Sequence, residues 1–379
     1  MPDKLGRLTF ILTCVALAFV ACDSQSEDTA EKIDRLMSAY RGNVPGASVL
    51  VIRDGTIVFR RAYGLSDLER RVTTTPATNY RLASMTKQFT AAAILLLAQE
   101  GRLSLDDPIR KWLPTLPTAA APITVRHLLT HVSGLVDYEE IIPEGQSRQL
   151  HDTDVLRLLE SQERTYFVTG SQFRYSDSGY ALLALIVGRV SGEDFASFLR
   201  RRIFLPLGMQ ATVAYEQGIS VVANRAFGYS APGQTWTRTD QSLTSAVLGD
   251  GGIYSSVDDL AKWDAALYDS RVLSTESLRQ IFTPAIATED PNVRYGFGWR
   301  MTGETVWHSG ETLGFRNVIV RYPRRHFTVI ILTNRSEPEP YTTALAIAKL
   351  FFLDADATRA SQIVVGPDSG ARPLHADSH

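Results

Sequence analysis

Cysteine is almost absent from this sequence. Only two of its 379 residues are cysteine, Cys14 and Cys22, and both precede the long stretch that must form the folded domain. An internal disulfide in that domain is therefore excluded, although an oxidising compartment would permit one. The remaining chain is long enough to bury a large core, so its stability does not require cross-links.

An excess of charge of one sign is also absent. The sequence has 39 Lys and Arg residues against 41 Asp and Glu residues, which gives a formal net charge of −2. The basic residues are scattered along the chain and do not form a dense cluster. This balance gives no reason to expect a nucleic-acid partner.

Long apolar runs are lacking beyond the N-terminus. The run over residues 8–21 follows two basic residues and is too short for a stable membrane span, so it predicts an export signal over residues 1–22. It ends in Ala18-Phe19-Val20-Ala21-Cys22, which resembles a bacterial lipoprotein cleavage box. We therefore expect an exported periplasmic or cell-envelope protein, held at a membrane surface by lipid chains on Cys22. Ordinary secretory cleavage nearby is the alternative.

Strand-rich segments lie at both ends of the domain. Residues 47–53 and 56–63 are β-rich runs joined by Asp54-Gly55, a sequence typical of a hairpin turn. Further β-rich runs follow near the C-terminus, over residues 295–301, 304–309, 315–322 and 327–333. The two ends of the domain are therefore predicted to share one antiparallel sheet.

Helical spacing of apolar residues fills the middle of the domain. The predicted helices cover residues 86–99, 154–160, 179–190, 195–204 and 256–267, with others ending near Tyr40 and covering 341–352. The expected fold class is α+β, with an antiparallel sheet built from N- and C-terminal segments, flanked by helices, and an inserted, mostly helical subdomain. We expect one domain over residues 30–354 and a disordered tail over residues 355–379, which are mostly small and polar.

The first motif that can carry chemistry is Ser84-Met85-Thr86-Lys87. A spacing of three places Ser84 and Lys87 on one face of a helix. A serine hydroxyl needs a neighbour that removes its proton, and a partly desolvated lysine can do so. The alternative is a serine that caps the helix and a lysine in solvent.

Two further motifs lie later in the chain. Tyr175-Ser176-Asp177 precedes a predicted helix, and its tyrosine can relay protons if a cation lowers its pKa. His308-Ser309-Gly310 is followed by Glu311, and Gly310 would let a substrate lie close to the strand edge. The alternatives are a core tyrosine and a turn with an exposed histidine.

In this order, the three motifs resemble the serine β-lactamase and penicillin-binding superfamily, whose signature is Ser-x-x-Lys, Ser/Tyr-x-Asn and Lys-Thr-Gly. The tyrosine of the second motif is similar to the class C β-lactamase-like branch, which includes D-alanyl-D-alanine carboxypeptidases, D-amino-acid peptidases and esterases. The segments 127–135 and 249–256 also resemble that branch, and the resemblance covers about residues 30–350. It implies the β-lactamase/transpeptidase-like fold.

The resemblance also implies a role for each motif residue. Ser84 attacks and becomes acylated, while Lys87 and Tyr175 share its proton and later activate water. The backbone N–H groups of Ser84 and Glu311 form the oxyanion hole, and His308 stands where the family often has lysine. The implied activity is that of a serine hydrolase on amide or ester bonds.

Two positions depart from the family pattern. Asp177 replaces the usual asparagine, and Glu311 follows Gly310 where β-lactamases often have a small or hydroxyl residue. Two added acids near the site disfavour an anionic substrate by charge repulsion. Among small peptide, ester or β-lactam-like substrates, we therefore expect a neutral ester or a peptide with a free amine.

Other kinds of site are less well supported by the sequence. His127 and His131 have the spacing of zinc-binding histidines, but Leu128 stands where zincins have glutamate and no third ligand is evident. We therefore expect neither a metal nor another cofactor. A Gly-x-Ser-x-Gly pentapeptide, which an α/β-hydrolase requires, does not occur. The alternative from another class is a catalytically silent protein that binds peptidoglycan fragments or an envelope protein, and Asp177 and His308 favour it.

Overall fold

The computed structural model describes residues 29–231, 233 and 235–363. The predicted signal over residues 1–22, with Cys22, lies outside the described residues, as does part of the predicted tail, residues 364–379. Among the described residues, 29–36 and 345–363 fall into one unit, and those between 37 and 344 form a second unit. The sheet and all motif residues of the predicted active site belong to the second unit.

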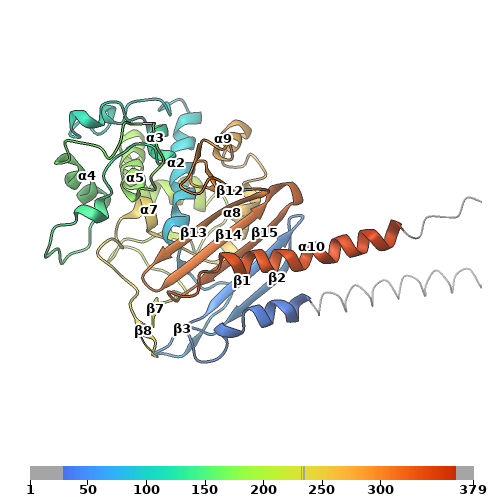
Figure 1. The fold of residues 1–379 in the computed structure, drawn as a ribbon. Helices are drawn as coiled ribbons and strands as arrows, with labels where there is room; N and C mark the ends of the chain where they lie inside the picture. Colours follow the sequence, from blue (N-terminus) through green and yellow to red (C-terminus); the bar gives the residue numbers. More distant parts are fainter. Residues whose placement is uncertain (1–28, 232, 234, 364–379) are drawn as a thin grey trace, which may run out of the picture. The chain divides into compact units, whose positions relative to one another are not determined.

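The second unit contains a large antiparallel sheet, whose strand order is β10-β11-β12-β13-β14-β15-β1-β2 (Figure 1). The bounds of its strands are β1 Ala47–Arg53, β2 Thr56–Tyr63, β10 Ile286–Ala287, β11 Arg294–Tyr295, β12 Arg300–Thr302, β13 Thr305–Thr312, β14 Phe315–Tyr322 and β15 Phe327–Thr333. Early and late segments therefore lie side by side, with β1 paired to β15 from Ala47↔Thr333 to Arg53↔Phe327. The predicted α+β class and the origin of its sheet are confirmed.

The burial of each strand follows from its residues. All seven residues of β15 and six of the seven of β1 are buried, as expected for apolar strands in the middle of a sheet. Strand β2 lies at the sheet edge and is mostly exposed. The turn between β1 and β2 places Asp54 and Gly55 at positive φ (51° and 74°), which is the conformation that a tight hairpin requires.

Helices fill the segment between β2 and β10, as predicted (Figure 1). Their bounds are α2 Lys87–Gln99, α3 Val125–Leu129, α4 Asp152–Glu160, α5 Asp177–Ser191, α6 Phe195–Leu199, α7 Leu248–Gly251, α8 Val257–Ala266 and α9 Thr275–Ile281. Helix α2 is buried on all sides from Lys87 to Leu97 and contacts both α5 and α7. A helix surrounded in this way is a fixed platform for the residues at its start.

Some elements differ from the sequence prediction. The expected strand over residues 295–301 is divided into β11 and β12, because the chain turns at Gly298 (φ +76°), where a Cβ would lie 2.7 Å from the carbonyl oxygen of Lys87. The expected helix over 195–204 becomes π-helical after Leu199. Helix α10 (Tyr341–Ile363) continues past its predicted end at residue 352 and includes the first part of the predicted tail.

A three-stranded sheet that the sequence did not predict fixes the chain just before Ser84. Its order is β5-β9-β6, with β5 at Tyr80–Arg81, β9 at Ile253–Ser255 and β6 at Val213–Ala214. The backbone N–H of Leu82 extends this pairing by donating to the carbonyl oxygen of Ile253 at 2.8 Å. The segment that carries Ser84 is therefore tied to the segment after α7.

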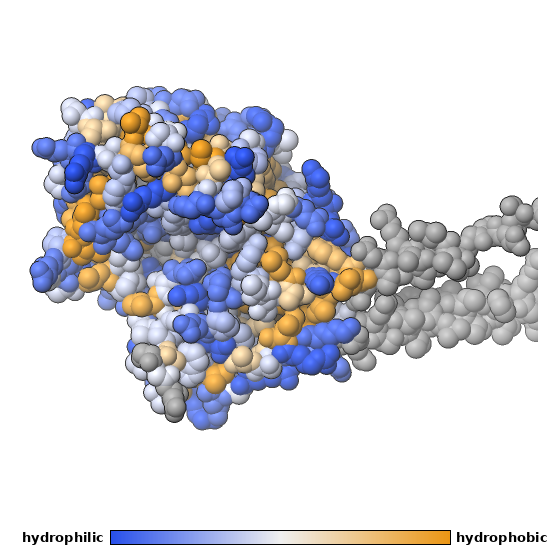
Figure 2. Space-filling view, viewed as in Figure 1, coloured by the Kyte–Doolittle hydropathy of each residue, from blue (hydrophilic) through white to orange (hydrophobic). Residues whose placement is uncertain are grey.

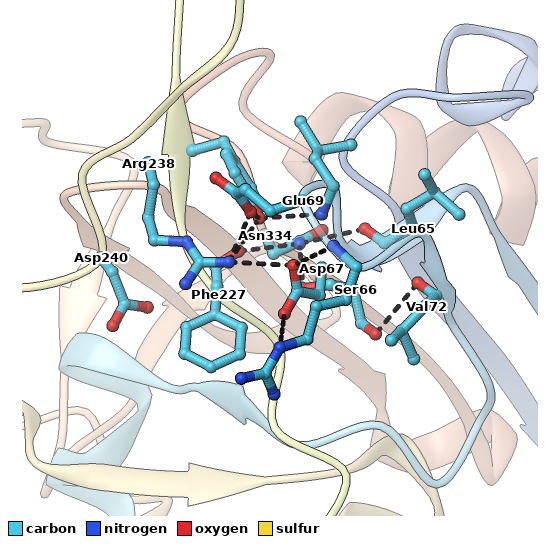
Figure 3. A network of polar contacts seen from close by, with 12 residues as sticks. Leu65, Ser66, Asp67, Glu69, Val72, Phe227, Arg238, Asp240 and Asn334 are labelled. Carbon is cyan, nitrogen blue, oxygen red and sulfur yellow. Dashed lines mark hydrogen bonds and ion pairs between the residues drawn. The ribbon is translucent and has the colours of Figure 1, made fainter.

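A network of polar contacts joins Phe227 and Arg238 to residues 65–67 and to Asn334, the residue directly after β15 (Figure 3). Asn334, directly after β15, donates through Nδ2 to the carbonyl oxygens of Leu65 (3.1 Å) and Phe227 (2.8 Å). Arg238 donates to Asp67 at 2.9 Å, and its guanidinium carbon lies 4.1 Å from the centre of the Phe227 ring. These contacts fix a long connection that has only short strands of its own.

The visible face of the molecule is mostly hydrophilic, and its hydrophobic residues form scattered patches (Figure 2). Within residues 29–231, 233 and 235–363, no helix combines the length and apolar character needed to cross a bilayer.

Candidate active site

Ser84 lies in a short 3-10 helix, η2 (Ala83–Thr86), between β5 and α2. The residue before it, Ala83, has a φ of +50°, a conformation that is unfavourable for any residue with a Cβ. Such strain persists only where the surrounding structure enforces it, and it often marks functional sites. Here it forms the sharp turn that places Ser84 beside the start of α2.

Lys87, the first residue of α2, has a completely buried side chain. Its Nζ atom donates to Ser84 Oγ at 2.9 Å, to Asp177 Oδ1 at 2.6 Å and to the carbonyl oxygen of Asp250 at 3.0 Å. These three bonds use all three donors of an ammonium group. The alternative of a lysine in solvent is therefore wrong.

The charge state of Lys87 follows from its neighbours. Burial alone lowers the pKa of its amine, but the negative charge of Asp177, followed by the influence of Tyr175 and Asp250, outweighs burial and raises the pKa above its ordinary value. Lys87 is therefore an ammonium ion in the resting site. In this state it cannot accept the proton of Ser84.

Tyr175 lies next to this ammonium group. The centre of its ring is 4.9 Å from Lys87 Nζ, and its buried hydroxyl makes no hydrogen bond of ordinary geometry with any described residue. Burial raises the pKa of Tyr175, and the charge of Lys87 lowers it without cancelling the effect of burial. The nearby cation thus lowers this pKa, as the motif requires, but burial outweighs it and the net pKa of Tyr175 lies above its ordinary value.

Asp177 is the first residue of α5 and points toward Lys87. The cap position of α5 is Ser176, where no side-chain cap bond forms in the described chain, so Asp177 does not cap this helix. The backbone N–H of Asp177 donates to Asp137 Oδ2 at 2.8 Å. A second acidic residue, Asp137, is therefore joined to the Lys87–Asp177 pair through the backbone of Asp177.

Strand β13 carries the third motif. His308 is buried; its Nδ1 donates to the carbonyl oxygen of Ser309 at 2.6 Å, which leaves Nε2 to accept from the Tyr295 hydroxyl at 3.1 Å. Burial, then the charges of Arg300 and Lys87, hold the pKa of His308 well below its ordinary value. The alternative of an exposed histidine in a turn is therefore wrong, and His308 is a neutral residue of the site wall.

Gly310 and Glu311 follow on the same strand. A Cβ on Gly310 would overlap the carbonyl oxygen of Leu82 and lie 3.3 Å from the backbone nitrogen of Met85. Glycine therefore allows β13 to lie directly against the turn before Ser84. The Glu311 side chain is 56% exposed and lies 3.7 Å from Arg316.

A small pocket of about 50 Å³ opens beside Ser84. Its lining residues are Arg81, Ala83, Ser84, Tyr138, Glu139, Asp177, Thr244, Asp250, Gly251, Glu311 and Thr312. The pocket thus brings Ser84, Asp177 and Glu311 to one surface, whereas Lys87, Tyr175, His308 and Gly310 do not line it. Four of its lining residues are acidic and one is basic, so it favours a neutral or cationic group.

Sequence reasoning missed several residues of the site. Arg300 lies with its guanidinium carbon 5.3 Å from the Tyr175 ring and forms no ion pair within the described ranges. Tyr138 donates to the buried carboxyl group of Asp250 at 2.8 Å. The only sequence signal was that Asp250 lies in the segment 249–256, which resembles the family, and nothing local marked Arg300 or Tyr138.

The two histidines considered as metal ligands make separate contacts. His127 Nδ1 accepts from the backbone N–H of Thr124 at 3.1 Å, and His131 Nδ1 accepts from that of Ser176 at 3.1 Å. Among the residues that the structure covers, no group of three His, Cys, Asp or Glu side chains is placed to hold a metal ion.

Comparison with known proteins places this site in context. A family model described as Beta-lactamase matches residues 30–353. Penicillin-binding protein 4* of Bacillus subtilis is 31% identical over 317 residues, which are 79% of this chain and 70% of that protein. Protein flp of Staphylococcus aureus is 28% identical over 322 residues, and the match spans only 64% of its length.

Solved structures show the same fold. The penicillin-binding protein homologue from Pyrococcus abyssi matches with a TM-score of 0.75 and 30% identity, over 86% of this chain and 77% of the other. The D-amino acid amidase from Ochrobactrum anthropi, solved with L-phenylalanine amide, matches with a TM-score of 0.73 and 26% identity, over 88% and 99%.

Proposed function

This chain belongs to the beta-lactamase family of serine hydrolases, and we propose that it cleaves amide or ester bonds through an acyl-enzyme formed on Ser84. One observation carries the proposal: Ser84 Oγ accepts a hydrogen bond from a buried lysine that Asp177 holds as an ammonium ion, beside a buried tyrosine hydroxyl. A site that only binds a ligand needs no such grouping around a serine.

In the proposed mechanism, the phenolate form of Tyr175 is the base, because Lys87 already carries its full set of protons. The pKa of Tyr175 is raised, so this phenolate forms by loss of the phenol proton to solvent as the pH rises. The Tyr175 oxygen takes the proton of Ser84 while Oγ bonds to the substrate carbonyl carbon and the carbonyl becomes an oxyanion. The backbone N–H groups of Ser84 and Glu311 stabilise that oxyanion. Its collapse releases the leaving group, which takes the proton from Tyr175. Water then attacks the acyl-enzyme, with Tyr175 again as base.

The acidic pocket suggests the substrate class. Glu139, Asp177 and Glu311 all line the space beside Ser84, so an acyl donor with a negative charge there is repelled. We propose a D-amino-acid peptide or carboxypeptidase-like substrate with a free amine, or a neutral ester, and we expect efficient β-lactam hydrolysis to be absent. The relative solved as a D-amino acid amidase supports an amide with a free amine.

Intact-protein mass spectrometry tests the proposal. The protein is exposed to penicillins, D-Ala-D-Ala peptides, D-amino acid amides and short-chain esters, and the added mass identifies the acyl group and its lifetime. We expect a transient adduct on Ser84 from an ester or an amine-bearing amide. Absence of any adduct, together with no labelling by a fluorophosphonate, would instead support the silent binding protein.

Replacing Asp177 with Asn is expected to move the alkaline rise of kcat/KM to lower pH by about one unit or more. The negative charge of Asp177 raises the pKa of both Lys87 and Tyr175, so its removal lowers both values. A base then becomes available at lower pH, and anionic β-lactams are better tolerated. The measurement is a pH–rate series on both proteins.

The control for this series is Asp107→Asn, which removes an aspartate paired with Lys111 on the surface. We expect its pH profile to match that of the wild type. Superimposable limbs for Asp177→Asn, with only a loss of thermal stability, would contradict a role of Asp177 in setting these pKa values.

For localisation, we propose a lipoprotein of the cell envelope, based on the sequence before Cys22. Cys22→Ser is expected to move the protein from the membrane fraction to the soluble fraction, because the acyl chains would be lost. Cys14→Ser is the matched control and should leave the fractionation unchanged. Equal membrane association of the Cys22→Ser variant and the wild type would leave ordinary secretion as the better explanation.

A further inference from the structure

His131 is a buried histidine that the proposed mechanism does not use. It lies just after α3, only 1% of its surface is exposed, and its φ is +58°. A histidine in the left-handed conformation is uncommon, and the surrounding structure must hold it there. Contacts with the rest of the fold, and not local backbone preference, therefore hold His131 in this conformation.

His131 contacts the residues on both sides of Tyr175. Its carbonyl oxygen accepts from the backbone N–H of Arg174 at 3.0 Å, and its Nδ1 atom accepts from that of Ser176 at 3.1 Å. Between these two bonds, the His131 and Tyr175 rings lie with their centres 4.3 Å apart. Three contacts from one residue thus fix both the backbone and the ring of Tyr175.

The hydrogen bonds determine the form of the His131 ring. A backbone N–H group only donates, so Nδ1 of His131 must be the unprotonated nitrogen and the neutral ring carries its proton on Nε2. Burial, followed by the charges of Lys87, His308 and Arg300, lowers the pKa of His131 well below its ordinary value. Nε2 itself is buried without a hydrogen-bond partner among the described residues, which argues against a role in proton transfer.

We propose that His131 is a positioning residue, which holds Tyr175 beside Ser84 and Lys87 through its Nδ1 atom, its carbonyl oxygen and its ring, without exchanging a proton itself. This inference rests on the proposed function, because it presumes that Tyr175 acts as the base. It assigns a task to the second histidine of the 127–135 segment, which the sequence alone suggested only as a metal ligand.

Three substitutions separate the contributions of His131. His131→Asn keeps an acceptor near the position of Nδ1, and asparagine tolerates the left-handed conformation. His131→Phe keeps a ring but leaves the N–H of Ser176 unpaired. His131→Ala removes both contacts. We expect kcat to fall less than about 5-fold for Asn, about 10-fold for Phe and about 100-fold for Ala, with smaller changes in KM.

The pH profile gives a readout that a purely structural role would not change. Burial is the largest cause that raises the pKa of Tyr175. Removal of the imidazole in His131→Ala admits water beside the phenol, so the alkaline limb of kcat/KM is expected at lower pH than in the wild type. His131→Phe keeps the Tyr175 phenol buried, so the alkaline limb of its kcat/KM profile should lie at the same pH as in the wild type.

The matched control is His127→Ala, four residues earlier, where the ring contacts Thr124 and belongs to the cap of α3. We expect its kcat and pH profile to match the wild type after correction for any loss of folded protein. Equal losses of kcat in His127→Ala and His131→Ala, or an unchanged limb in His131→Ala, would overturn the inference. Failure of both His131→Asn and His131→Phe to fold would also overturn it.

The rate of Ser84 labelling by a fluorophosphonate distinguishes this inference from the proposed function. A wild-type protein that is not labelled would refute the proposed function itself. Labelling of the wild type and of His131→Ala at the same rate would refute only the role of His131. We expect the wild type to be labelled and His131→Ala to be labelled about 10- to 100-fold more slowly.

Discussion

Replacing Ser84 with Ala is expected to lower kcat/KM by about four orders of magnitude or more, which is the usual effect of removing a nucleophile. The fold should remain intact, because Ser84 Oγ does not cap η2 or α2 in the described chain and accepts only from Lys87 among the described side chains. Kinetics on the best substrate of the panel and the Tm of both proteins provide the measurement.

The control for this variant is Ser161→Ala, which removes a surface hydroxyl that bonds the carbonyl oxygen of Leu158. Its activity should equal that of the wild type. If Ser84→Ala kept more than a small fraction of the wild-type rate, or still formed an acyl adduct, Ser84 would not be the nucleophile.

Gly310→Ala is expected to lower both the stability and the activity of the protein. The added methyl group would overlap the carbonyl oxygen of Leu82 and press on the backbone of Met85, and neither group is a flexible side chain that can rotate away. Either β13 or the turn that carries Ser84 must therefore move. We expect a loss of about 1–3 kcal/mol in the free energy of unfolding, as for other overpacked sites. We also expect kcat to fall about 100-fold, because small displacements of reacting groups are costly.

Gly233→Ala is the control, since its added Cβ would meet no described atom within 4 Å. Activity and Tm should remain those of the wild type. A Gly310→Ala protein with an unchanged kcat would show that the close approach of β13 to Leu82 is not needed to place Ser84.

The sequence predicted the parts of the fold that depend on local pattern. The hairpin at Asp54-Gly55 and strands β14 and β15 have the expected bounds, because alternation, β-branched residues and turn glycines determine them within a few residues. The small sheet β5-β9-β6 was missed because its strands have two or three residues and gain their pairing from distant segments. A strand of that length has no periodicity to detect.

The properties of the candidate site also depend on residues that are distant in sequence. The motifs identified Ser84, Lys87 and Tyr175, but the net rise in the pKa of Tyr175 could not be predicted, because the burial that causes it could not be read from its neighbours in sequence. Arg300 and His131 gain their significance only from residues far along the chain. Distances and burial across the fold, and not residue types, decide those roles.

The position of β1 in the sheet has a consequence for synthesis of the protein. Its two neighbours are β2, which follows at once, and β15, and the nearby bond from Gly46 to Asn334 joins residues 288 positions apart. At about 5–20 residues per second, a ribosome takes on the order of tens of seconds to add that much chain. Throughout this time, one edge of an apolar strand has no native partner. Strand β1 therefore reaches its final pairing, and the sheet that places β13 beside the Ser84 turn is complete, only after β15 has been made.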